Sequence, residues 1–133
     1  SYNELTFSFD EDEHNEYEIQ IDEIVNLPNG KIIEKVDETN DTSNYTIRLS
    51  SKEISLPLYV RNRRDGDKIE LKGLNAHKKV SEIFINEKIK TSDRNTWPVV
   101  LDSKEKIVWL PGLKKSNLDK KITEEYDIIL RYY

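Results

Sequence analysis

The chain has 133 residues, enough for one domain of ordinary size, and its lack of cysteine together with two isolated histidines argues against a disulfide framework or a metal site. Its formal net charge of −5 conceals two halves of opposite sign, because residues 1–57 hold 14 acidic and 4 basic side chains whereas residues 58–133 hold 12 and 17. This asymmetry indicates a polyanion-binding face in the second half.

Alternating apolar residues predict β-strands in the first half of the chain. Steps of two connect Leu5, Phe7 and Phe9, then Tyr17, Ile19 and Ile21, and then Tyr45, Ile47 and Leu49. Turn-forming residues separate the later runs at LPNG, residues 27–30, and at ETNDTSN, residues 38–44. The pattern favours a β-meander, in which the acidic run DEDEHNE at residues 10–16 is a solvated hairpin loop rather than a metal-binding or interaction tract.

The start of the second half predicts an arginine-rich turn between two short strands. The strands are expected over residues 56–61 and 68–71, joined by the segment NRRDGD. Gly66 should adopt a positive φ in this turn, because a side chain is disfavoured in that conformation. Asp67 is expected to cap the turn by accepting hydrogen bonds from nearby backbone amides.

A single helix is predicted after these strands. In the segment KKVSEIFINE, residues 78–87, the apolar side chains Val80, Ile83 and Phe84 are spaced as on one face of a helix. The intervening positions are polar or charged, so the helix should be short and amphipathic, with the two lysines at its start.

Three further strands are expected toward the C-terminus. Residues 97–101 and 107–110 are apolar runs that flank the polar segment DSKEK, as in a hairpin. Pro111 and Gly112 should form the turn that ends the second of these strands. A last strand is expected over residues 126–133.

The predicted fold class is α+β, mostly β. Since one domain accounts for the length, an acidic β-rich segment, residues 1–56, and a basic domain, residues 57–133, should pack as one compact unit. The N-terminus has no targeting pattern, and no apolar run approaches about 18 residues. We therefore expect a cytoplasmic chain without a membrane partner.

Sequence patterns of catalytic sites are absent from these 133 residues. The glycines at positions 30, 66, 73 and 112 stand alone, so no glycine-rich phosphate loop is present. His14 and His77 lack a neighbouring nucleophile in a triad-like pattern. We expect no catalytic residue, no metal site and no cofactor in this chain.

The second half resembles the C-terminal domain of bacterial tRNA(Ile)-lysidine synthase. The resemblance lies in an ordered series between about residues 58 and 113: YVRNRRDGDKI, HKKVSEIFINEKI, Arg94, WPVVLD and IVWLPGL. It implies a layered, β-sandwich-like domain with one short helix, similar to a module of the phenylalanyl-tRNA synthetase β subunit. Residues 1–57 match only as the variable β segment that precedes the series in some members.

The resemblance also implies an activity for the whole enzyme. Members of the family are ATP-dependent ligases that attach lysine to the wobble cytidine of an isoleucine tRNA with a CAU anticodon. Their catalytic domain carries an SGGxDS loop, which this sequence lacks. We therefore expect an inactive fragment without ATP or Mg²⁺, whose partners are the tRNA acceptor stem and its own catalytic domain, with a homodimer possible in the full-length enzyme.

Acceptor-stem RNA would give the basic residues of the second half a role. A-form RNA is bound through phosphates and the shallow minor groove, and arginine can contact a phosphate with two parallel hydrogen bonds. The candidate tRNA-binding residues are Arg61, Arg63, Arg64, Lys68, Lys78, Lys79, Arg94, Lys114 and Lys115. Strand alternation would place Arg61 and Arg63 on one face and Arg64 on the other.

Structural alternatives stay open for the same residues. Arg61 or Arg63 could pair with Asp65 or Asp67 and close the turn. At the level of function, the alternative to an RNA-binding region is a non-catalytic protein-interaction or interdomain packing module, in which the basic turn neutralises the acidic half.

Two other pairs of residues also carry alternatives. Trp97 and Trp109 could stack on unpaired bases, but their apolar strand patterns favour the core. Lys114 and Lys115 could be either solvent-exposed charges or a second phosphate contact.

Overall fold

A computed structural model describes residues 16–74 and 76–133. The strand predicted around Phe7 and the acidic run as far as Asn15 lie outside the described residues. Within the described ranges, no helix is long and apolar enough to cross a membrane.

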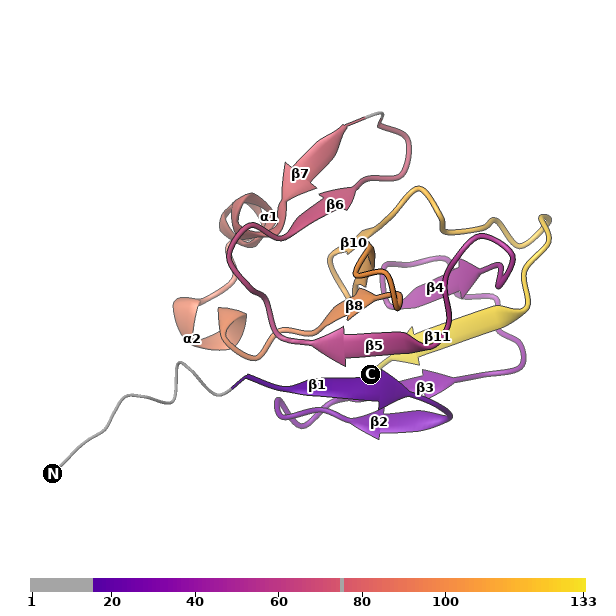
Figure 1. The fold of residues 1–133 in the computed structure, drawn as a ribbon, viewed down its shortest axis with the longest axis horizontal. Helices are drawn as coiled ribbons and strands as arrows, with labels where there is room; N and C mark the ends of the chain where they lie inside the picture. Colours follow the sequence, from indigo (N-terminus) through magenta and orange to yellow (C-terminus); the bar gives the residue numbers. More distant parts are fainter. Residues whose placement is uncertain (1–15, 75) are drawn as a thin grey trace, which may run out of the picture.

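The described residues form two β-sheets, of which the larger has seven strands, six of them in the order β1-β5-β8-β9-β6-β7, with β10 paired to β9 (Figure 1). Neighbouring strands are antiparallel except for β6 and β9, which run parallel. The strand bounds are β1 (Glu18–Ile21), β5 (Leu58–Arg61), β6 (Lys68–Glu70), β7 (His77–Lys79), β8 (Val99–Leu101), β9 (Ile107–Leu110) and β10 (Lys114–Lys115).

The smaller sheet has four antiparallel strands in the order β2-β3-β11-β4. Its strands are β2 (Ile24–Asn26), β3 (Ile32–Lys35), β4 (Thr46–Leu49) and β11 (Ile128–Tyr132). Two short helices, α1 (Val80–Asn86) and α2 (Thr91–Arg94), follow β7 and lie together at one end of the molecule (Figure 1).

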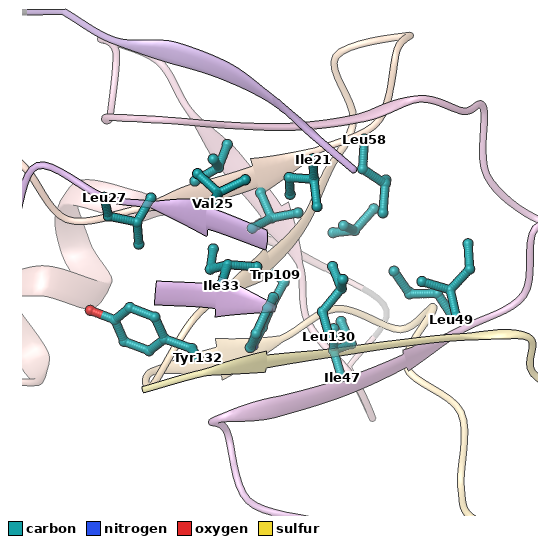
Figure 2. Close-up of a cluster of buried hydrophobic side chains, with 14 residues drawn as sticks. Ile21, Val25, Leu27, Ile33, Ile47, Leu49, Leu58, Trp109, Leu130 and Tyr132 are labelled. Atoms are coloured by element: carbon teal, nitrogen blue, oxygen red, sulfur yellow. The ribbon is translucent and has the colours of Figure 1, made fainter. Parts of the chain in front are cut away.

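The main core lies between the two sheets. Figure 2 shows its side chains converging from both sheets around Trp109, with Ile33 and Tyr132 on the side of the smaller sheet. A second core packs α1 against the other face of the larger sheet, through Ile83 and Phe84. Strand β9 is therefore buried at every position, which explains its uninterrupted apolar sequence.

Both tryptophans belong to these cores, as predicted. Trp109 is fully buried and its indole N–H donates to the carbonyl of Asn44 at 3.0 Å. Trp97 is half-buried beside Phe84, and its indole N–H donates to the carbonyl of Pro111 at 3.0 Å. The local partners satisfy the polar end of each ring.

The predicted class, mostly β in two layers, is confirmed, as are the hairpin of β8 and β9 and the last strand β11. The β-meander predicted for the first half is wrong. Strand β1 pairs with β5, and β4 pairs with β11, so the acidic and basic segments share both sheets. Pairing between distant strands depends on packing of the whole chain, which alternation along one segment does not encode.

Two further expectations need correction. The single helix is joined by α2, whose four residues are too few to show a helical period. Lys78 and Lys79 lie in β7 and do not start the helix, because they pair with β6 and α1 begins at Val80. The two strands on either side of the arginine-rich turn are present as predicted, with β8 and β9 between them in the sheet.

Candidate nucleic-acid interface

The arginine-rich turn after β5 is held by its own aspartate. Gly66 has a φ of 87°, in the left-handed region expected for it. The carboxylate of Asp67 accepts a hydrogen bond from the backbone N–H of Arg64 at 2.8 Å. The backbone carbonyl of Asp67 accepts a second hydrogen bond, from the N–H of Val80 at 3.0 Å. The turn is thereby fixed to the start of α1.

Arg61, the last residue of β5, has a structural role. Its guanidinium Nη1 and Nη2 donate to the two carboxylate oxygens of Asp67 at 2.9 and 3.1 Å, and Nη1 also donates to the carbonyl of Asn62 at 3.0 Å. The residue is only 5% exposed. The ion pair left open by the sequence is therefore formed, and we remove Arg61 from the set of phosphate contacts.

The neighbouring arginines instead meet Arg94 at a surface hollow of about 400 Å³. Arg63 and Arg64 come from the turn, and Arg94 comes from the end of α2, where its Nε donates to the carbonyl of Ile89 at 2.8 Å. Figure 1 shows the connection from β5 to β6 curving past the two helices. The remaining lining residues are Glu16, Asn62, Asp65 and Asn95.

The ion pairs that Arg63 and Arg64 form with carboxylates are exposed and therefore weak. Arg63 Nη1 lies 3.6 Å from Asp65, and Arg64 Nη2 lies 3.2 Å from Glu18. Solvent-exposed ion pairs of this kind contribute about 0–1 kcal/mol. A phosphate oxygen can replace these carboxylates at little cost, whereas breaking the buried pair of Arg61 would leave a charge without its partner.

Strand pairing separates the lysines around β6 and β7 into two sets. Lys68 and Lys79 are directly opposite each other across the two strands, and both are exposed. Within the described ranges, neither makes an ion pair. Like charges in this arrangement repel, so an anion between them would be stabilising. Lys78 is opposite the buried Ile69 and points to the other face.

Lys114 and Lys115 in β10 do not line the hollow. Lys114 Nζ lies 3.7 Å from the carboxylate of Glu87. Lys115 Nζ donates to the carbonyls of Thr42 and Ser43, each at 3.1 Å, which makes it part of a different region. The structure thus brings three of the nine candidate residues, Arg63, Arg64 and Arg94, to the hollow, and it pairs Lys68 with Lys79 on the two strands that follow the turn.

Sequence reasoning missed the polar residues that complete the hollow. Asn62 accepts from the N–H of Tyr17 at 3.2 Å and donates to the carbonyl of Asn95 at 3.1 Å, so it connects the residue before β1, the turn and the end of α2. The hydroxyl of Tyr17 donates to the carbonyl of Thr96 at 2.8 Å, and burial raises its pKa above the usual range. No sequence motif marked these residues, because their contacts span segments far apart in the chain.

The turn predicted at Pro111 and Gly112 does not line this hollow. Gly112 has a φ of 80° and donates its N–H to the carbonyl of Asn44 at 2.8 Å. It packs against the rings of Tyr45 and Tyr132. In the part of the chain that the structure describes, no three histidine or acidic side chains form a group that could hold a metal ion.

Comparison with known proteins places the chain in a family. A family model described as the TilS substrate C-terminal domain matches residues 58–128, more than half of the chain. The chain belongs to this family. A crystal structure of a TILS C-terminal domain has a TM-score of 0.80 and 35% identity to it, covering 89% of this chain and 96% of that one.

Curated relatives of this TilS C-terminal domain are much longer proteins. The tRNA(Ile)-lysidine synthase of Bacillus subtilis (strain 168) is 41% identical over 88% of this chain, which covers 26% of that protein. The synthase of Geobacillus kaustophilus (strain HTA426) is 36% identical over 100% of the chain, which covers 30% of that protein. The bifunctional protein TilS/HprT of Listeria innocua is 36% identical over 99% of it, with 22% of that protein covered.

Proposed function

We propose that this domain is the tRNA-binding C-terminal region of a tRNA(Ile)-lysidine synthase acting in the cytoplasm. That enzyme would use ATP to attach lysine to the wobble cytidine of an isoleucine tRNA with a CAU anticodon. Membership of the TilS C-terminal domain family and the names of the curated relatives support the assignment. Catalysis, ATP and Mg²⁺ would belong to a separate domain with an SGGxDS loop, which these 133 residues lack.

The observation that carries the tRNA-binding role is the meeting of Arg63, Arg64 and Arg94 at one hollow with exchangeable partners. Planar guanidinium groups contact phosphates with two parallel hydrogen bonds, which suits the backbone of an A-form acceptor stem. Lys68 and Lys79 extend the positive surface from the adjacent strands. We call these five residues the arginine surface.

The contribution of the arginine surface can be estimated from its exposure. A hydrogen bond to a charged group contributes about 1.5–3 kcal/mol, but salt screens exposed charges and each arginine must first leave a carboxylate. Loss of Arg63 and Arg64 together should therefore weaken tRNA binding by roughly 1–3 kcal/mol, or about 5-fold to 150-fold.

A second candidate function is packing against the rest of the same enzyme. Ile24 and Leu56 are 52% and 51% exposed. Leu56 lines a hollow of about 250 Å³ that has an apolar floor and the charged residues Asp22, Glu23 and Lys35; its apolar lining residues are Ile21, Leu56, Pro57, Leu58, Ile128 and Leu130. Since the chain covers only 22% to 30% of three curated relatives, a packing surface for the remainder of such a protein is reasonable. This role would not produce affinity of the isolated domain for tRNA.

The two functions are separated by measuring binding of fluorescent tRNA to the isolated domain by anisotropy. The crystal structure of the related C-terminal domain contains almost nothing besides this domain, because the match covers 96% of its chain. The isolated domain is therefore a suitable sample. The Arg63→Ala/Arg64→Ala variant should bind roughly 5-fold to 150-fold more weakly. The matched control, Lys31→Ala/Lys35→Ala, removes two exposed charges around β3 and should bind within about twofold of the wild type. Absence of tRNA binding, or equal losses in both variants, would favour the packing role.

A further inference from the structure

We propose that a second cationic hollow, around the buried Arg48, is a binding site for a phosphate group. It shares no lining residue with the hollow of the arginine surface. Part of its wall is the segment between β10 and β11, which Figure 1 shows away from the two helices. Its volume is about 220 Å³, and its lining residues are Thr42, Arg48, Lys72, Lys115, Asp119, Lys120, Lys121, Ile122 and Thr123.

Arg48 is the most unusual residue of this hollow. It is 1% exposed, and its Nη1 and Nη2 donate to the carbonyls of Asp41 and Thr39 at 2.9 and 2.6 Å. Its buried Nε donates to no acceptor in the described part of the chain. The guanidinium lies over the ring of Tyr126, 5.7 Å from the centroid, but within the described residues no carboxylate pairs with it. A buried cation with only neutral partners is stabilised by an anion nearby.

The lining of the same hollow contains more lysines than acidic residues. Asp119 is the single acidic lining residue, and its side chain is 2% exposed. Its Oδ2 lies 2.6 Å from Lys72 Nζ and 3.5 Å from Lys115 Nζ, while its Oδ1 accepts from the N–H of Arg48 at 3.1 Å. One carboxylate is therefore shared by two ammonium groups, and neither is fully neutralised.

Acidic residues at the rim of the hollow neutralise only part of the positive charge of the lysines. Lys120 Nζ lies 2.8 Å from the carboxylate of Glu53. The carboxylate of Asp41 accepts a hydrogen bond from the hydroxyl of Thr46 at 2.6 Å and keeps its negative charge at the rim. The side chain of Lys121 is exposed and forms no ion pair with any described residue, although its backbone N–H donates to Glu124 at 2.7 Å. Lys72 and Lys121 thus remain to contact a phosphate, whereas Lys115 Nζ already faces the carbonyls of Thr42 and Ser43 and the carboxylate of Asp119.

The phosphate could belong to an RNA backbone or to a free phosphorylated compound, and both would make the same contacts. The site is independent of the proposed tRNA role of the arginine surface, because it is argued from its own charges. Titration of the ¹⁵N-labelled domain with inorganic phosphate, at constant ionic strength with chloride, tests it directly. We expect saturable shifts of the amide signals of Thr42, Arg48 and Ser116, which lie in or beside the hollow.

The Lys72→Gln/Lys121→Gln variant should bind phosphate about tenfold more weakly, since it removes two of the charged donors. Lys31→Gln/Lys104→Gln is the matched control and should leave the shifts unchanged. If the first variant unfolds, Lys121→Gln alone provides the test, because that side chain is exposed. Shifts that are absent, or identical in all variants, would overturn the site.

A second arm of the experiment identifies the source of the phosphate. If RNA supplies it, the Lys72→Gln/Lys121→Gln variant should lower the salt dependence of binding to duplex RNA by about one phosphate contact. If the phosphate titration is lost in the variant while RNA binding is unchanged, the ligand is a free phosphorylated compound. Loss of RNA binding in the Arg63→Ala/Arg64→Ala variant concerns only the arginine surface and leaves this conclusion unaffected.

Discussion

Arg61→Ala should destabilise the domain without removing an RNA contact. The wild-type guanidinium makes two hydrogen bonds to Asp67 and one to the carbonyl of Asn62, and the two side chains of the pair are 6% and 10% exposed. Removing one partner of a buried ion pair costs about 3–5 kcal/mol. Asp67 keeps the hydrogen bond from the N–H of Arg64, so we expect a loss near the lower end, about 3 kcal/mol.

Urea unfolding followed by tryptophan fluorescence measures this loss, because Trp109 is fully buried. Arg64→Ala, which removes an exposed ion pair, is the control and should cost less than about 1 kcal/mol. The Arg61→Ala/Asp67→Ala variant should cost less than the sum of its single variants, since both charges are then absent. A loss below about 1 kcal/mol for Arg61→Ala, accompanied by weaker RNA binding, would refute the structural role and restore Arg61 as a phosphate contact.

Three further outcomes are expected. Gly66→Ala should lower the free energy of unfolding in urea by about 1 kcal/mol, because the φ of Gly66 is 87°. Gly112→Ala should lower it by more, since the added Cβ would also meet the Tyr45 ring at 3.3 Å. Equal losses for the two variants would contradict the packing around Gly112. Hydrogen bonds from Thr46 and Ser43 lower the pKa of Asp41 in the folded domain below its ordinary value of 3.8. The ionised carboxylate should therefore stabilise the fold above pH 3.8, and this stabilisation should be lost as the pH falls through the pKa of the folded state. Asp41→Asn should therefore flatten the acid limb of the stability profile, and an unchanged limb would contradict the assignment. Finally, the isolated domain mixed with ATP, lysine and tRNA should release no pyrophosphate, because it lacks a nucleotide-binding loop, and lysine-dependent release would place catalysis in this chain.

The sequence predicted the strands better than their partners. Alternation identified β1 and β4, because Ile21 of β1 and Ile47 and Leu49 of β4 lie in the core between the sheets. The pairing of β1 with β5 joins segments about 40 residues apart, and it depends on the packing of both sheets. Helix α2 was missed because four residues show no period, although it carries Arg94 to the arginine surface.

The roles of the basic residues at the hollow were likewise not predictable from the sequence pattern alone. Alternation placed Arg61 and Arg63 on one face, but β5 ends at Arg61, so the rule does not extend to Arg63. Arg61 turns inward to Asp67, whereas Arg63 lies at the hollow with Arg64 and Arg94. Residue type indicated the chemistry of the segment, and only the tertiary contacts distinguished the structural arginine from the exposed ones.

The salt dependence of duplex RNA binding tests the central claim most directly. The slope of log affinity against log salt counts the phosphates neutralised, and the five residues of the arginine surface predict a slope of about −4. The Arg63→Ala/Arg64→Ala variant should reduce the magnitude of that slope by about 2. A slope near zero for the wild-type domain, or the same steep slope in the variant, would contradict the assignment of RNA binding to this surface.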